Sequence, residues 1–402
     1  MPLIRQRRSA GSYRVYRICR WPLARARCGT FCKAGGLPII SVRKTDFVLE
    51  IFTRLLATSA PLGREQVVLA VEQLVDAVVS PLAKADFLCE LARKGETVEE
   101  ITAFARALRE RSIEPPLDAV WRESHEILDV CGTGGDRLNT FNISTTVAFI
   151  CAAAGVPVAK HGNRAVTSQA GSADVLEALG IRIDLPPSEA AASLRERHFT
   201  FFFAPNYHPA FKHIGPARRL CAERGQRTIF NFLGPLLNPA RPSAQLLGVP
   251  AGNLCEPLAK VLQSLGVRRA MVVCGEIRDP QPNGSRLPAF LDELSPLGDN
   301  MIAEFYQEHG FSASTLPLVE FPLQLASLAD LVGGDRLANA KIIGDILEGK
   351  ERGPKRDAVL LNCAAALFVA GRTRSLIAGW SLATDVIDSG HALRKLRELQ
   401  AD

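Results

Sequence analysis

The 402-residue sequence contains no apolar run of about 18 or more residues, the length that a membrane-spanning helix needs. Its cysteines include Cys28 and Cys32 at close spacing but no matching downstream pair, so we expect no structural zinc site. Most of the cysteines lie in apolar surroundings, as reduced thiols of intracellular proteins do. No apolar core precedes a small-residue cleavage site, so we expect no secretory signal. These absences predict a cytoplasmic protein with no membrane partner.

Acidic residues are absent from residues 1–45, which carry 11 Lys and Arg. The formal net charge of the whole chain is +6, so the remainder carries about 6 − 11 = −5. A mildly acidic body does not attract a polyanionic strand, and we expect no nucleic-acid partner.

Residues 1–45 also lack clear periodicity, and we predict them to be a basic, disordered extension. Three interpretations stay open: an organellar transit peptide, a phosphate-binding arm, or a tail produced by a gene start placed too far upstream. Ser and Thr are sparse, so we favour the third. A transit peptide would change the expected compartment from the cytoplasm to an organelle.

The remaining sequence has the size and composition of two globular domains, with 47% hydrophobic and 22% charged residues. Residues 46–116 repeat apolar residues at helical spacing, and Thr97 to Glu100 fit a capping box. We predict a small helical domain there, with helices from about residues 205–225 packing on it. Pro115 and Pro116 mark the linker to a larger domain over residues 117–402.

The larger domain alternates short apolar runs, glycine turns and helices, which indicates an α/β fold with a central, mostly parallel sheet flanked by helices. The predicted strands precede the glycine turns near residues 132 and 162, and others are expected at residues 181–185, 199–203, 246–249 and 270–273. In such a sheet the ligands bind at the carboxyl ends of the strands.

Polar and small residues gather in three clusters between Asp129 and Asp174: GTGGD at 132–136, NISTT at 142–146 and KHGNR at 160–164. A glycine-rich turn lets backbone N–H groups approach an anion closely. Asn, Ser and Thr at the start of a helix leave its N–H groups facing a phosphate, and Lys and Arg add positive charge. Each cluster alone is more often an ordinary turn, helix cap or loop. Together they predict a ligand with several phosphates.

These clusters, with Ser168 eight residues after Lys160 and GSAD following at 171–174, resemble the anthranilate phosphoribosyltransferases, which belong to the nucleoside-phosphorylase-like phosphoribosyltransferases. The resemblance extends from about Asp46 to the C-terminus. It implies transfer of the phosphoribosyl group of 5-phosphoribosyl 1-diphosphate to the amine of anthranilate in tryptophan biosynthesis. It also implies two Mg²⁺ ions per subunit and a homodimer formed through the helical region.

The resemblance assigns site residues by their positions in these motifs. The phosphoribosyl diphosphate would be bound by Gly132, Gly135, Asp136, Thr140, Asn142, Ile143, Ser144, Thr145, Lys160, His161, Gly162, Asn163, Arg164, Ser168 and Ser172. Anthranilate would be bound by Gly132, Asn163 and Arg218, and the metal ions by Ser144, Asp292 and Glu293. No residue is assigned as an acid or base, because the amine of anthranilate is mostly unprotonated at neutral pH.

The sequence departs from the family pattern after Cys274 and Gly275, where residues 276–290 look like an inserted loop before the acidic pair. The helix that follows Arg218 is also longer than in the family. Two alternatives are a pyrimidine nucleoside phosphorylase and a non-catalytic nucleic-acid-binding relative. The first loop of the former resembles KHSTGG rather than DVCGTGGD, and the latter would require eroded motifs and a basic body.

Overall fold

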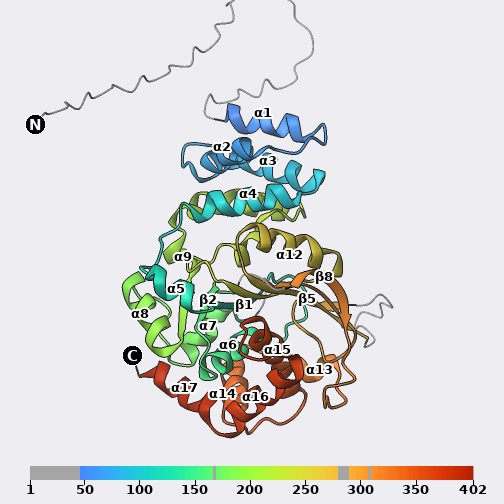
Figure 1. Cartoon of the computed structure of the whole chain (residues 1–402). Coiled ribbons are helices and arrows are strands. Elements are labelled where there is room, and N and C mark those ends of the chain that lie inside the picture. Colours follow the sequence, from blue (N-terminus) through green and yellow to red (C-terminus); the bar gives the residue numbers. More distant parts are fainter. Residues whose placement is uncertain (1–45, 166–168, 279–288, 307–308, 402) are drawn as a thin grey trace, which may run out of the picture. The chain divides into compact units, whose positions relative to one another are not determined.

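A computed structural model describes residues 46–165, 169–278, 289–306 and 309–401 (Figure 1). All of these residues belong to one compact unit. The expected division at residue 116 therefore stays a prediction. The expected extension at residues 1–45, and Ser168, lie outside the described residues.

The N-terminal part consists of four helices: α1 (Phe47–Leu56), α2 (Arg64–Val75), α3 (Pro81–Lys94) and α4 (Val98–Arg109). The predicted capping box is confirmed: the Thr97 Oγ1 accepts from the Glu100 N–H at 3.2 Å, and the Glu100 carboxylate accepts from the Thr97 N–H at 2.9 Å. Helix α10 (Gly215–Glu223) packs on α3. Nearby, the buried Lys84 Nζ donates to the carbonyl of His213 at 3.0 Å.

The central sheet has eight strands among the described residues, in the order β3-β2-β1-β4-β5-β7-β8, with β6 paired to β5. Strands β1 to β5 run parallel, whereas β6 and β7 pair with β5, and β8 with β7, in the antiparallel sense. Their bounds are β1 (Leu128–Gly132), β2 (Val158–Gly162), β3 (Phe199–Phe203), β4 (Ala244–Gly248), β5 (Arg269–Ile277), β6 (Ala289–Leu291), β7 (Asn300–Tyr306) and β8 (His309–Leu316).

Both faces of the sheet are buried, because alternate residues of each strand enter different hydrophobic clusters. Val130 of β1 and Leu246 of β4 pack with α6 (Ile143–Ala153) and α15 (Pro354–Val369). The residues that directly follow these two, one on β1 and one on β4, pack on the other face with α12 (Cys255–Ser264) and with the N-terminal helices. One apolar cluster thus runs from the sheet into the helical part, which explains why the described residues form a single unit.

The remaining helices complete the layers around the sheet. They are α5 (Ala119–Ser124), α7 (Ser172–Ala178), α8 (Pro187–Arg197), α9 (Ala204–Tyr207), α11 (Phe230–Leu233), α13 (Leu328–Leu331), α14 (Arg336–Leu347), α16 (Leu376–Asp388) and α17 (His391–Gln400), with 3₁₀ turns at Pro209–His213, Gly234–Leu236 and Gly252–Leu254.

The expected fold class is confirmed, since an N-terminal helical part precedes a mostly parallel sheet flanked by helices. The strand expected at residues 181–185 is wrong: Ile181 and Ile183 are buried, but the segment pairs with no strand in the described part of the chain. Their alternation fits a loop that presses two side chains into the core. Among the described residues, no helix has the length and apolar character needed to cross a bilayer.

Candidate active site

A cavity of about 370 Å³ lies at the carboxyl ends of β1 and β2. Because these strands are parallel neighbours, the loops that follow them meet at one edge of the sheet. The cavity is lined by Cys131, Gly132, Thr133, Gly134, Gly135, Asp136, Arg137, Asn139, Thr140, Phe141, Asn142, Ile143, Ser144, Lys160, His161, Gly162, Asn163, Arg164, Ala165, Ala170, Gly171, Ser172, Asp292 and Glu293. The structure therefore brings together most of the predicted site residues, including an acidic pair from a distant part of the chain.

The glycine loop after β1 packs directly against Asp292. A Cβ atom at Gly132 would lie 2.2 Å from the Asp292 Oδ2, and one at Gly248 would lie 1.5 Å from the Asp292 carbonyl oxygen. The Gly134 N–H donates to the Asp292 Oδ2 at 2.6 Å. Glycine is needed at Gly132 and Gly248 because any larger residue would displace the acidic segment.

Three carboxylates converge beside this loop. Burial, followed by the nearby charges of Asp136 and Glu293, raises the pKa of Asp292 well above its usual range. Burial raises the pKa of Glu293 to about 7, although Lys160 and hydrogen bonds from the Ser144 backbone and hydroxyl favour its charged form. Carboxylates held this close repel one another unless protons or cations neutralise them.

This oxygen set fits a hard divalent cation such as Mg²⁺, which binds carboxylates and hydroxyls and retains several waters. The three predicted metal ligands, Ser144, Asp292 and Glu293, all line the cavity. Within the described ranges, no group of three or more His, Cys, Asp or Glu side chains forms a ready-made metal cage. Three side-chain ligands would leave positions around an octahedral Mg²⁺ ion for waters and for a phosphate ligand.

Lys160 is a buried cation at the floor of the cavity, with 1% of its surface exposed. Its Nζ donates to the Val130 carbonyl at 2.8 Å and to the Ser144 Oγ at 3.3 Å. Burial lowers its pKa, while Asp129 and Glu293 among others favour the charged form. Lys160 thus connects β1 and β2 to the predicted metal ligand Ser144.

Two polar residues at the start of α6 are placed differently from what their positions suggest. The Asn142 side chain forms no cap bond to α6; it donates to the Ala170 carbonyl at 3.3 Å and accepts from Asn339 at 3.0 Å. Thr145 is fully buried and does not line the cavity, and its Oγ1 has no hydrogen-bond partner within the described residues. Asn142 therefore braces the loop, while the Thr145 hydroxyl is an unsatisfied group behind it.

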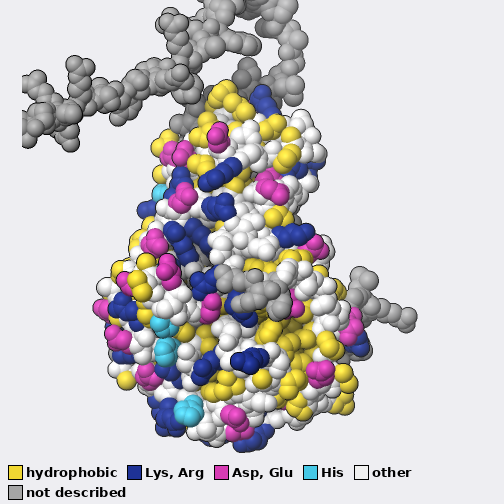
Figure 2. Space-filling view, viewed as in Figure 1, with side chains coloured by type: hydrophobic (Ala, Val, Ile, Leu, Met, Phe, Trp, Pro, Cys, Tyr) yellow, Lys and Arg dark blue, Asp and Glu magenta, His cyan; other side chains and the backbone are white. Residues whose placement is uncertain are grey.

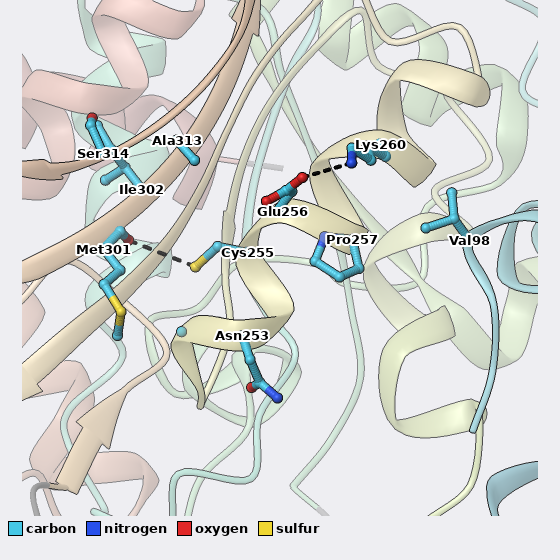
Figure 3. A pocket seen from close by; sticks show the side chains of 11 residues that line it. Val98, Asn253, Cys255, Glu256, Pro257, Lys260, Met301, Ile302, Ala313 and Ser314 are labelled. Atoms are coloured by element: carbon cyan, nitrogen blue, oxygen red, sulfur yellow. Dashed lines mark hydrogen bonds and ion pairs between the residues drawn. The ribbon is translucent and has the colours of Figure 1, made fainter. Parts of the chain in front are cut away.

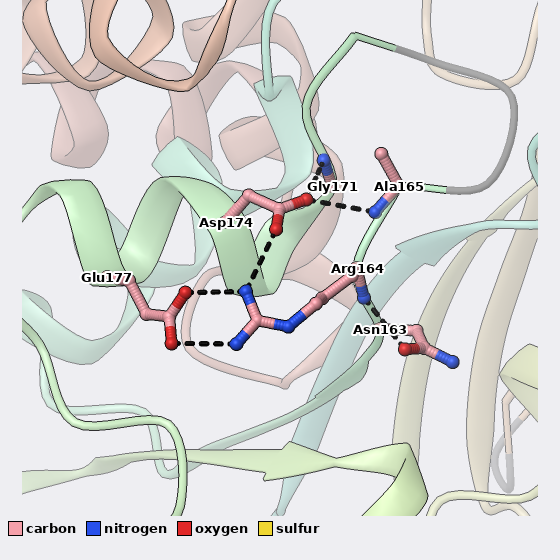
Figure 4. A network of polar contacts seen from close by, with 6 residues as sticks. All are labelled: Asn163, Arg164, Ala165, Gly171, Asp174 and Glu177. Carbon is pink, nitrogen blue, oxygen red and sulfur yellow. Dashed lines mark hydrogen bonds and ion pairs between the residues drawn. The ribbon is translucent and has the colours of Figure 1, made fainter.

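Arg164 lines the cavity, but its guanidinium turns toward α7 (Figure 4). It pairs with Glu177 at 2.6 and 2.8 Å and with Asp174 at 3.1 Å. The side chain of Asn163 lies on the other side of the backbone in the same view. Gly162 approaches Ser172 closely, because a Cβ on Gly162 would lie 3.4 Å from the Ser172 Cβ.

His161 is a buried, neutral imidazole. Burial, together with the neighbouring His208, lowers its pKa to about 3. Its Nδ1 lies 3.2 Å from the Gly234 carbonyl, which only accepts, so Nδ1 carries the proton and Nε2 is left as an acceptor. The His208 ring lies 5.2 Å from the His161 ring, and burial lowers the His208 pKa to about 4.

The basic residues near α10 are exposed. Arg218 stacks on the Phe230 ring at 5.5 Å and does not belong to the lining of the cavity as described above. Arg227 was not singled out by sequence motifs, yet its Nη2 lies 4.0 Å from the Cβ position of Gly135. A basic residue shortly after a predicted helix gives no signal by itself, so only the fold reveals that it flanks the glycine loop.

A second cavity, of about 390 Å³, lies beside α12 and strands β7 and β8 (Figure 3). Its lining includes Met301, Ile302 and the Glu256–Lys260 pair, and it contains none of the predicted site residues that the structure describes. On the face shown in Figure 2, acidic and basic side chains are interspersed over much of the surface.

Comparison with known proteins gives a consistent result. Residues 124–393 match the family described as the glycosyl transferase family, a/b domain, and residues 49–112 match its helical bundle domain. The chain is 46% identical to the anthranilate phosphoribosyltransferase of Petrotoga mobilis, over 82% of this chain and 90% of that protein. It is 44% identical to the enzyme of the same name from Symbiobacterium thermophilum, over 88% and 97%.

Solved structures are similar over the same region. The crystal structure of anthranilate phosphoribosyltransferase from Thermus thermophilus superposes with a TM-score of 0.75 at 39% identity, covering 87% of this chain and 98% of that one. The Saccharomyces cerevisiae enzyme in complex with PRPP and Mg gives a TM-score of 0.74 at 27% identity, covering 88% and 97%. A further structure of the yeast enzyme contains 4-fluoroanthranilate.

Proposed function

The chain belongs to the anthranilate phosphoribosyltransferase family, and we propose that it transfers the phosphoribosyl group of 5-phosphoribosyl 1-diphosphate to the amine of anthranilate. The products are N-(5-phosphoribosyl)anthranilate and pyrophosphate, and the reaction is a step of tryptophan biosynthesis. The observation that carries the proposal is the convergence of the GTGGD, NIST and KHGN segments with Asp292 and Glu293 on one cavity.

The reaction breaks the bond between C1′ of the ribose and the diphosphate. Positive charge develops on the ribose and negative charge on the leaving group, so the reaction needs positioning and charge neutralisation more than a strong base. The neutral His161 does not supply positive charge, so the anion would face Lys160, Arg137 and backbone N–H groups of the lining. This agrees with a site to which no acid or base is assigned.

The diphosphate binds in this proposal between the glycine loop and the loop after β2. Gly132, Gly135 and Asp136 form one wall, and Lys160, Gly162, Asn163 and Ser172 form the other, with Thr140, Ile143 and Ser144 at the start of α6. Positive φ values of 74° and 95° at Gly134 and Gly135 allow a turn that residues with side chains rarely adopt.

Ser144, Asp292 and Glu293 would hold Mg²⁺, with two ions per subunit, and the metal would neutralise the diphosphate as it leaves. The chain's own contribution is to keep these oxygens in place. The Ser144 backbone and hydroxyl donate to Glu293, and Gly134 donates to Asp292. The acidic pair is therefore held to the glycine loop and to the start of α6.

Anthranilate carries a carboxylate, which a guanidinium recognises through two parallel hydrogen bonds. Arg218 fits this role by its motif position, and its guanidinium is stacked on Phe230 rather than paired with an acid in the described structure. Gly132 and Asn163 would contact the same substrate from the cavity.

The helical part exposes several large apolar side chains, including Phe47 (58% exposed), Val78 (62%) and Leu82 (52%). Phe47 lies on α1, Leu82 on α3 and Val78 between α2 and α3, and apolar side chains that gather in one exposed patch are typical of contact surfaces. We propose that this part forms a homodimer, which light scattering of the purified protein would detect as twice the mass of 43.6 kDa.

A fluorescence assay tests the proposed function. Purified protein with Mg²⁺, phosphoribosyl pyrophosphate and anthranilate should consume anthranilate fluorescence and release pyrophosphate. Reactions that lack the phosphoribosyl donor or contain a chelator are the controls. Constant fluorescence, together with phosphate-dependent cleavage of thymidine, would instead identify a pyrimidine nucleoside phosphorylase.

A further inference from the structure

In the loop between β2 and α7, residues 163–165 and residues 171–173 lie side by side and form a narrow stem. The carboxylate of Asp174 links the two arms of this stem. The Asp174 Oδ2 accepts from the Ala165 N–H and from the Gly171 N–H, both at 2.9 Å. Ala165 and Gly171 lie on opposite arms of the stem, so a single oxygen bridges both arms (Figure 4). The Ala173 N–H also donates to the Asn163 carbonyl at 3.3 Å.

At Gly171 the backbone of one arm of the stem approaches the backbone of the other arm closely. A Cβ at this position would lie 2.4 Å from the Ala165 nitrogen and 2.7 Å from the Asn163 carbonyl oxygen, distances that real Cβ atoms do not adopt. Ser172 follows directly and lies beside Gly162. The stem therefore fixes the distance between Asn163 and Ser172, both of which line the cavity.

The Arg164 guanidinium braces this stem from outside. Its two terminal nitrogens form parallel bonds to Glu177, and one of them also donates to Asp174. The cluster of Arg164, Asp174 and Glu177 has a formal charge of −1, so the two carboxylates offset the charge that the guanidinium could offer to a phosphate. Arg164 also lies 5.6 Å from the Phe203 ring, which further limits its orientations.

We propose that Arg164, Asp174 and Glu177 are positioning residues, which hold the stem so that Asn163 and Ser172 face the phosphoribosyl diphosphate. The Arg164 guanidinium itself does not contact phosphate. This inference rests on the proposed function, and it revises the expectation that Arg164 binds the donor directly. Glu177 then contributes to donor binding although it lies outside the lining of the cavity as the structure describes it.

The two roles of Arg164 predict opposite effects of removing Glu177. If the guanidinium bound phosphate, Glu177→Gln would free its charge and leave the KM for the donor unchanged or lower it. If Arg164 positions the stem, Glu177→Gln weakens the brace, because it replaces one of the two acceptor oxygens with an NH2 group and removes the carboxylate charge. The KM for phosphoribosyl diphosphate should then rise about tenfold, with less than about a twofold change in the KM for anthranilate.

The experiment compares Arg164→Gln, Glu177→Gln and the double variant by steady-state kinetics with each substrate varied in turn. We expect both single variants to raise the donor KM by a similar factor, and the double variant to add little to either. Arg164→Lys, which keeps the charge but loses the fork, should resemble Arg164→Gln. Additive effects, or a raised donor KM in Arg164→Gln alone, would identify Arg164 as a direct phosphate ligand and overturn the proposal.

Arg182 and Glu189 offer a matched control, because Arg182 has the same 46% side-chain exposure as Arg164 and pairs with Glu189 at 3.4 Å. Glu189→Gln should leave both KM values unchanged. Melting temperatures of all variants separate lost folding from lost positioning, since unfolding lowers active enzyme concentration and not the ratio of the two KM values. Absence of anthranilate consumption in the wild type and in Glu189→Gln would contradict the proposed function rather than this inference.

Discussion

The sheet side and the α10 side of the candidate site are built differently. On the sheet side, Lys160 and Glu293 are buried, and the loops are braced by hydrogen bonds to Asp292 and Asp174. On the α10 side, Arg218 and Arg227 are exposed. A buried, cross-braced wall suits the diphosphate, whose charges need fixed partners, whereas exposed arginines suit a substrate that enters and leaves from solvent. The comparison predicts that damage to the sheet side costs more activity.

The largest effect should follow Gly132→Ala. The added Cβ would overlap the Asp292 Oδ2 at 2.2 Å, so the acidic segment must shift away from the glycine loop. A displacement of this kind should lower kcat/KM by about a hundredfold or more. Gly344→Ala on α14 is the control, because a Cβ there meets no atom within 4 Å, and it should leave kinetics unchanged. Equal, near-wild-type activity in both variants would show that the sheet side tolerates displacement.

Lys160→Ala should raise the KM for phosphoribosyl diphosphate by about tenfold to a hundredfold, because it removes the buried cation beside Glu293 and Ser144. The KM for anthranilate should change far less. Kinetics with each substrate varied separately will measure the difference. Lys341→Ala, at a lysine with 75% side-chain exposure, serves as the control. A larger rise in the KM for anthranilate than in that for the donor would contradict the assignment of Lys160 to donor binding.

Arg218→Ala tests the other side of the site and should give the reverse pattern, with the KM for anthranilate raised about tenfold and that for the donor little changed. Its neighbour Arg219, also exposed on α10, provides the control Arg219→Ala. Equal effects on both substrates would remove Arg218 from its assigned role, and Arg227→Ala would then be the next variant to measure.

The smallest effect concerns His208, which connects the two sides through ring contacts of 5.2 Å to His161 and to Phe211. Burial lowers its pKa to about 4 from the ordinary 6.5, so between these values the unfolded chain binds more protons. Its contribution to stability is therefore complete above pH 6.5 and declines as the pH falls toward 4.

In the wild type, the free energy of unfolding should fall as the pH is lowered from 6.5 to 5. In His208→Gln this fall should be smaller, by up to about 1.4 kcal/mol per pH unit, as measured by urea denaturation. The exposed His391 supplies the control variant His391→Gln, which is measured over the same pH range. An unchanged slope in His208→Gln would mean that its ring does not stay neutral in the folded protein.

Local sequence predicted the elements whose causes are local. The capping box at Thr97, the glycine turns after β1 and β2 and the helix after NIST depend on nearby residues, and all are present. The segment at residues 181–185 shows the limit of this reasoning, because alternating apolar residues fit a strand and a buried loop equally well.

The directions of individual side chains were less predictable than the convergence of the loops after β1 and β2 at one edge of the sheet. Arg164 lies in a basic phosphate-loop motif, yet it turns to Glu177, which is thirteen positions further along the chain. Asn142 is occupied by Asn339 from the C-terminal half. Such partners come from tertiary packing, for which a single sequence carries no local signal.

The hydrogen bond between Gly134 and Asp292 joins residues 158 positions apart. At a translation rate of about 5–20 residues per second, the ribosome adds this length in roughly ten to thirty seconds. During that interval the nascent glycine loop has none of the acidic segment against which it packs. The candidate active site is therefore completed late in synthesis, after β6 has been made. Polypeptides released before that stage can contain every predicted phosphate-binding motif without the acidic pair.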